Sequence, residues 1–124
     1  MEPSATPEPG LLTLTELAEL GGTTTSAVRY YERTGLIESQ QTTGDRRGYP
    51  TRMVFVVRAA RLIQRVGYSA SEARDMLDRL PQDPSPEDWQ GLTDFLVSDA
   101  ERRVSELQDV LAELRSDRRI HDLP

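Results

Sequence analysis

A repeating line of apolar residues near the C-terminal end constrains this 124-residue chain most. Its spacing of three and four residues is the a/d register of a helix that packs along a second helix. The predicted helix covers residues 89–118, roughly 45 Å at 1.5 Å per residue. No other segment predicts a helix of that length, so we expect a second copy of the chain to cover the line. The alternative is that the helix folds back on its own domain. The predicted dimerisation residues are Val97, Ala100, Val104, Leu107, Leu111 and Leu114.

The composition argues against an enzyme. The chain has no cysteine and one histidine, His121. Disulfides, thiolate metal sites and cysteine nucleophiles are thereby excluded. A histidine-based metal site or catalytic triad would depend on His121 alone. We therefore expect no catalytic residues, no bound metal and no cofactor.

No apolar run approaches the twenty or so residues that cross a membrane. The first ten residues hold two Glu and no basic residue, and no apolar segment follows them. This pattern is unlike a secretory signal. We expect a cytoplasmic protein without a membrane partner.

The formal net charge of −6 is unevenly distributed. Residues 1–22 hold four Glu and no basic residue, a net of −4. Residues 23–68 hold eight Arg against three acidic residues, a net of +5, whereas residues 69–124 hold seven Arg against fourteen, a net of −7. Such asymmetry indicates one region that meets phosphate and another that does not.

The apolar spacing predicts a mainly α fold. We expect helices at 14–20, from Thr24 or Thr25 to Arg33, at 51–66, and from Ser69 or Ser71 to Leu80. Thr15 is predicted to cap the first helix, Thr24 or Thr25 the second, and Ser69 or Ser71 the fourth. Glycines interrupt residues 36–50, which predicts a β-hairpin or a loop.

The predicted domain boundaries follow from this order of elements. A disordered tail covers residues 1–10, and a domain made of the first four helices and the hairpin covers residues 11–80. A proline-rich linker covers residues 81–88 and precedes the helix at 89–118, and a second tail covers 119–124.

Three spaced residues predict a helix-turn-helix. Ala18 suits a close helix crossing, Gly22 suits a turn with positive φ, and Val28 suits a buried position on the second helix. Two packed helices without a DNA role are the alternative. The residues that follow favour DNA, because hydroxyl and guanidinium groups suit phosphates and base edges. The predicted DNA contacts are Thr24, Thr25, Ser26, Arg29, Tyr30, Arg33, Arg46, Arg47, Tyr49 and Arg52. Tyr31 is predicted to belong to the core.

A ligand site is a further possibility. Trp89, Phe95 and Tyr68 could gather where the linker meets the long helix, although core packing explains them as well. A regulator that responds to an apolar small molecule near Trp89 therefore stays open. A protein-interaction module that uses the acidic C-terminal half stays open too.

Several motifs resemble the MerR family of bacterial transcription regulators. They include Leu-Thr-Glu-Leu-Ala at residues 14–18, Arg-Tyr-Tyr-Glu-Arg-Thr-Gly-Leu-Ile at 29–37 and Arg-Gly-Tyr at 47–49. The resemblance implies a winged helix-turn-helix homodimer, whose long helices pair as an antiparallel coiled coil. It implies a palindromic promoter element in double-stranded DNA, distortion of that DNA, and only indirect action on RNA polymerase. Residues 24–33 would be the recognition helix of this nucleoid-associated regulator.

Within that family the chain looks most like the SoxR branch. The likeness rests on Leu80-Pro81, on Asp88-Trp89 and on the helix around Arg103-Val104. That branch holds an iron–sulfur cluster with four cysteines, and this chain has none. Iron–sulfur redox sensing by that route is therefore not expected.

Overall fold

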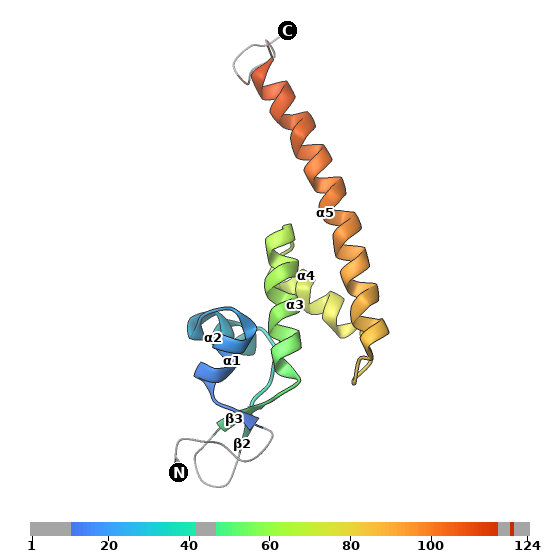
Figure 1. Ribbon diagram of the computed structural model, residues 1–124. Helices are drawn as coiled ribbons and strands as arrows, with labels where there is room; N and C mark the ends of the chain where they lie inside the picture. Colours follow the sequence, from blue (N-terminus) through green and yellow to red (C-terminus); the bar gives the residue numbers. More distant parts are fainter. Residues whose placement is uncertain (1–10, 42–46, 117–119, 121–124) are drawn as a thin grey trace. The chain divides into compact units, whose positions relative to one another are not determined.

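The computed structural model describes residues 11–41, 47–116 and 120. The chain divides into two compact units, Met1–Pro81 and Gln82–Pro124, and each is described by itself. Among the described residues, the first unit holds four helices and a small sheet, and the second holds one long helix (Figure 1). The predicted mainly α fold is confirmed.

Helices α1 (Leu14–Gly21) and α2 (Thr25–Arg33) are joined by a tight turn at Gly22. Gly22 has a φ of 73°, in the left-handed region, and its N–H donates to the carbonyls of Ala18 and Glu19. Glycine adopts this conformation without the strain that a Cβ introduces. The predicted helix-turn-helix is therefore present, with Gly22 in the turn.

Thr13 caps α1, and the prediction of Thr15 was wrong. Thr13 Oγ1 accepts the backbone N–H of Glu16 at 3.0 Å, and Glu16 Oε1 accepts the N–H of Thr13 at 2.9 Å. This reciprocal pair is a capping box, and it places Thr15 inside the first turn, where its hydroxyl cannot reach those donors. Thr24 caps α2 by accepting the N–H of Ala27 at 3.1 Å.

Helix α3 (Met53–Val66) packs against α1 and against α4 (Ala70–Asp78). A Cβ at Gly21 would lie 2.5 Å from Val57 Cγ1, so α1 and α3 approach too closely there for any other residue. Ser69 caps α4 in a second capping box, and α4 ends two residues before the predicted Leu80. The largest fully buried side chains of this core are Leu17, Val28, Ile37, Val57 and Ile63.

The predicted hairpin is present and carries a third strand that the sequence did not indicate. Strand β3 (Arg47–Pro50) lies between β1 (Leu11–Leu12) and β2 (Gln40–Gln41), antiparallel to both. Position 48 requires glycine because β1 lies close to it: a Cβ at this position would lie only 2.8 Å from Leu11 Cβ. The β2–β3 hairpin forms the wing, and β1 ties it to the start of α1.

The second unit consists mainly of α5 (Pro86–Arg115). Ser85 caps it in a capping box with Asp88, and the helix starts and ends three residues before the predicted limits. Proline is favourable in the first turn of a helix, where its missing N–H has no partner to lose. The predicted linker is correspondingly shorter. The large residues of the predicted dimerisation line are 44 to 66% exposed, and Ala100 is half-buried. These large residues are Val97, Val104, Leu107, Leu111 and Leu114.

Ion pairs within α5 support its middle turns. Asp99 is 9% exposed and accepts a hydrogen bond from Arg103 Nε at 3.0 Å. Arg102 donates to Asp99 from Nε and Nη2, and its Nη1 donates to Glu106 Oε2 at 2.8 Å. The bond to Asp99 is the main reason that the pKa of Arg102 is raised. Such pairs, three and four residues apart, stabilise the helix.

Candidate nucleic-acid interface

Helix α2 has one buried and one exposed side. Val28 and Tyr31 are buried in the core, so the predicted core position of Tyr31 is confirmed. Ser26, Arg29 and Arg33 are exposed and follow one another at helical spacing, and half-buried Thr25 lies beside them. The predicted recognition surface is therefore a continuous polar and basic side of one helix.

Tyr30 and Arg33 lie together at the C-terminal end of that surface. The Tyr30 ring is 43% exposed, and the Arg33 Cζ lies 5.9 Å from its centroid. At this distance the guanidinium is attracted by the face of the ring. An aromatic and a cation are thus presented side by side to solvent.

The N-terminal end of α2 is also exposed to solvent. Thr24 is exposed, and its hydroxyl oxygen accepts the N–H of Ala27. The hydroxyl hydrogen of such a cap can still be donated to another group. A helix N-terminus favours negative charge, so this end suits a phosphate.

The buried side of α2 is anchored to α3 and α4. The Tyr31 hydroxyl donates to Gln64 Oε1 on α3 at 2.9 Å. Burial raises the pKa of Tyr31 above its ordinary value of 10.0, although the charge of Arg61 opposes this, so the phenol stays protonated and donates. Arg74 Nη1 on α4 donates to the carbonyl of Thr34, just after α2, at 3.2 Å. These two bonds fix α2 to α3 and the residue after α2 to α4.

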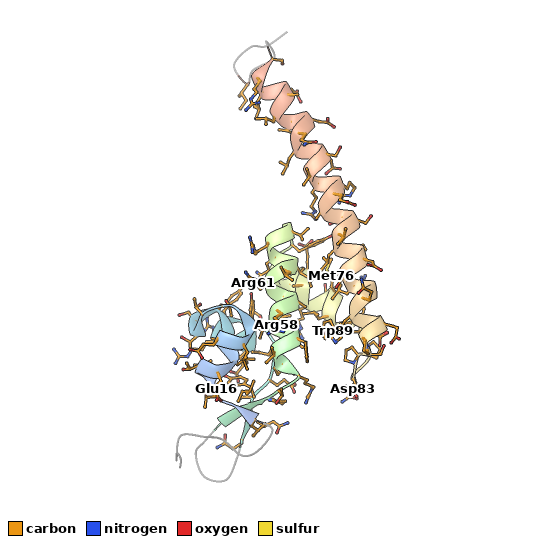
Figure 2. The ribbon with its side chains drawn as sticks, viewed as in Figure 1. Glu16, Arg58, Arg61, Met76, Asp83 and Trp89 are labelled. Carbon is orange, nitrogen blue, oxygen red and sulfur yellow. The ribbon has the colours of Figure 1, made fainter. Side chains whose placement is uncertain are left out.

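Basic residues on α3 are divided between scaffold and surface. Arg58 Nε donates to the carbonyl of Leu20 at 2.9 Å and so closes the C-terminal end of α1. Figure 2 shows Arg58 and Arg61 on the side of α3 that faces α1 and α2. Arg52, which precedes α3, is exposed and makes no capping bond with its side chain. Arg52 is thus exposed at the start of α3, and its predicted DNA contact stays a prediction.

The wing departs from the prediction at Tyr49. Its ring is 5% exposed, and its hydroxyl donates to Glu32 Oε1 at 2.7 Å. The predicted surface contact from Tyr49 was therefore wrong: the ring fills the space between β3 and the core. Arg46 and the side chain of Arg47 lie outside the described residues.

Glu32 is a residue that the sequence reasoning missed. Besides the bond from Tyr49, it accepts the Ser39 hydroxyl on Oε2 at 2.7 Å. The signal that could have found it is an acid in the last turn of a helix whose other charged residues, Arg29 and Arg33, are basic. A negative charge at this position repels phosphate, so a role within the protein is expected for it.

The described part of the chain has no candidate metal site. No group of three or more acidic, histidine or cysteine side chains among them could hold a metal ion. No helix in the described part of the chain is long and apolar enough to cross a membrane. Trp89 and Phe95 lie on α5 and Tyr68 follows α3, so the three predicted ligand contacts belong to different units.

A helix-turn-helix with an exposed polar second helix, followed by a small antiparallel wing, defines a winged helix-turn-helix DNA-binding protein. Residues 12–80, more than half of the chain, match the family model of the MerR HTH family regulatory protein. The chain therefore belongs to the MerR family and is a DNA-binding transcription regulator. It is also similar to the crystal structure of a MerR-family transcriptional regulator from Bacillus cereus. That likeness covers 92% of this chain and 87% of the other, at 20% identity and a TM-score of 0.50, and it shows the fold.

Proposed function

We propose that this regulator binds a palindromic promoter element as a homodimer and acts by distorting the promoter DNA. The observation that carries the proposal is the exposed side of α2, which presents Arg29 and Arg33 while its other side is fixed to the core. A rigid helix of this kind can enter a major groove without rearranging. RNA polymerase would then respond to the altered promoter and not to a direct contact.

The contacts divide by position along the first unit. Thr24 and Thr25 lie at the N-terminal end of α2, where phosphate is favoured. Ser26, Arg29 and Arg33 face the groove, and Tyr30 packs beside Arg33. Arg52 would meet the DNA backbone, and Arg46 and Arg47 complete the proposed set of contacts.

The homodimer is supported by the exposed line on α5. Large apolar residues at a/d spacing rarely stay open to water along a whole helix face. Two copies related by a twofold axis would cover each other and place two α2 helices on one duplex. The palindrome follows from that symmetry.

Within the family we propose a regulator of the SoxR type that lacks the cluster. The 124 residues contain no cysteine, so no thiolate among them can ligate an iron–sulfur centre. The proposal places its activity in the cytoplasm, on the nucleoid.

Salt dependence tests the DNA contacts. If about four Arg per protomer meet phosphates, the plot of log affinity against log salt has a slope of about −7 for the dimer. The measurement is fluorescence anisotropy with a duplex that the protein has enriched from a random library. Failure to enrich any duplex, or a flat salt response, would refute the proposed mode of binding.

A further inference from the structure

One carboxylate joins the recognition helix to both strands of the wing. Ser39, which precedes β2, donates to Glu32 Oε2 at 2.7 Å. Tyr49, in β3, donates to Glu32 Oε1 at 2.7 Å. Glu32 lies in the last turn of α2. One oxygen of this side chain therefore holds β3, and the other holds the residue directly before β2.

These bonds are of the strong kind. Hydroxyl groups that donate to an ionised carboxylate form short bonds, about twice as strong as bonds between neutral groups. Tyr49 is buried, and Glu32 and Ser39 are half-buried, so the two bonds are partly removed from solvent. The link between α2 and the wing is short and partly buried.

A negative charge on α2 works against DNA affinity. Glu32 lies beside Arg33 and one turn from Arg29, and a carboxylate near a phosphate is repelled by it. A neutral residue would remove that repulsion. The two hydrogen bonds show what the carboxylate provides instead, which is a fixed place for the wing.

The wing has a second attachment that does not depend on Glu32. Strand β3 pairs with β1, with Leu12 opposite Tyr49 and Leu11 opposite Pro50. Loss of the Glu32 bonds should therefore leave the sheet paired. What it should change is the angle between the wing and α2.

We propose that Glu32 is a positioning residue that sets the distance between the groove contact of α2 and the backbone contact of the wing. This inference rests on the proposed function, because it requires α2 and the wing to meet the same duplex. A fixed distance selects DNA whose groove width matches it, so Glu32 contributes to recognition of DNA shape without touching DNA.

The test compares Glu32→Ala and Glu32→Gln on a duplex that the wild-type protein has enriched. Affinity and hydroxyl-radical footprints are measured together. Glu32→Ala should bind about tenfold more weakly, since the wing must now be ordered at the moment of binding. Its footprint should lose the wing segment and keep the α2 segment. Glu32→Gln keeps one acceptor and gains a donor that the Ser39 or Tyr49 hydroxyl can accept. The wing segment that is lost in Glu32→Ala should therefore be present in the footprint of Glu32→Gln.

Exposed Glu38 supplies the matched control for charge. Glu38→Ala removes one negative charge from the same region and should leave the footprint complete. If Glu38→Ala and Glu32→Ala change the footprint alike, the effect is one of charge and the positioning role is overturned. An unchanged footprint and affinity for Glu32→Ala overturn it as well.

Tyr49→Phe and Ser39→Ala keep the test decisive if Glu32→Ala fails to fold. Each removes one hydroxyl and should weaken the wing footprint partly. The double variant Glu32→Ala/Tyr49→Phe should bind no worse than Glu32→Ala, because both changes break one link. Full additivity, or single variants with wild-type footprints, overturns the proposal. A wild-type protein that enriches no duplex refutes the proposed function and this inference together, whereas the variant outcomes refute this inference alone.

Discussion

Replacing Leu107 with Glu tests whether α5 joins two copies of the chain. Leu107 is 66% exposed, so most of its side chain is still available for burial. Complete burial of a leucine is worth about 1.5–3 kcal/mol, which leaves about 1–2 kcal/mol to be gained per copy. A dimer holds two copies and gains about 2–4 kcal/mol from this position.

Glutamate loses that gain and adds the cost of removing a charge from water. We therefore expect the dissociation constant of the Leu107→Glu dimer to rise at least about 30-fold, the equivalent of 2 kcal/mol. Because Leu107 is exposed within a single chain, the helix content of the variant should stay that of the wild type.

Sedimentation equilibrium over a range of protein concentrations measures the dissociation constant, and circular dichroism measures the helix content. Ser105→Glu is the matched control, because it adds the same charge two residues away on the opposite side of α5, where Ser105 is exposed. The reasoning is refuted if Leu107→Glu self-associates like the wild type, or if Ser105→Glu weakens the dimer equally.

Three further predictions concern the first unit. Arg29→Ala should weaken binding to the enriched duplex by about tenfold or more, because a guanidinium contact is worth about 1–3 kcal/mol. The thermal unfolding of the variant should stay that of the wild type. Loss of folding would mean that Arg29 is structural. Thr13→Ala should lower the free energy of unfolding by about 1 kcal/mol and Thr15→Ala by much less, measured by urea denaturation, because Thr13 is the cap; equal losses would contradict this. The raised pKa of Tyr31 means that the folded state holds this proton more tightly than the unfolded state does. The contribution of Tyr31 to the free energy of unfolding is therefore fully present below pH 10.0 and is lost as the pH rises past it. Tyr31→Phe should make that alkaline decline shallower, and a decline of the same slope would show that other groups cause it.

The features that the sequence predicted are those that a local pattern determines. The a/d line of α5, the glycine turn at Gly22 and the hairpin between residues 36 and 50 each follow from spacing within one short segment. Ser69 and Thr24 were among the predicted caps for the same reason, since a cap and its donor lie three residues apart. Their hydrogen bonds need no information from elsewhere in the chain.

The start of α5 and the cap of α1 differ from the predictions. The prolines of residues 81–86 predicted a linker, yet Pro86 is the first residue of α5, where proline is favourable. Thr13 and Thr15 both lie at the start of the apolar pattern, but only Thr13 is followed three residues later by a Glu that can reach back to its N–H. The Thr-x-x-Glu spacing of residues 13–16 therefore favours Thr13 as the cap, and the reciprocal bonds are present.

Tyr49 could not be assigned from the sequence because its partner is distant along the chain. An aromatic residue next to arginines suits a DNA contact, and that pattern is the same whether the ring faces solvent or the core. The structure places the hydroxyl beside Glu32, seventeen residues earlier, so that the ring lies in the core and the half-buried carboxylate accepts its hydrogen bond. In a domain with so few large buried side chains, a tyrosine can fill the core with its ring and fix the wing with its hydroxyl. The hydrogen bond between Glu32 and Tyr49 therefore accounts for both an acid on α2 and a tyrosine on β3. The basic residues next to them in the sequence account for neither.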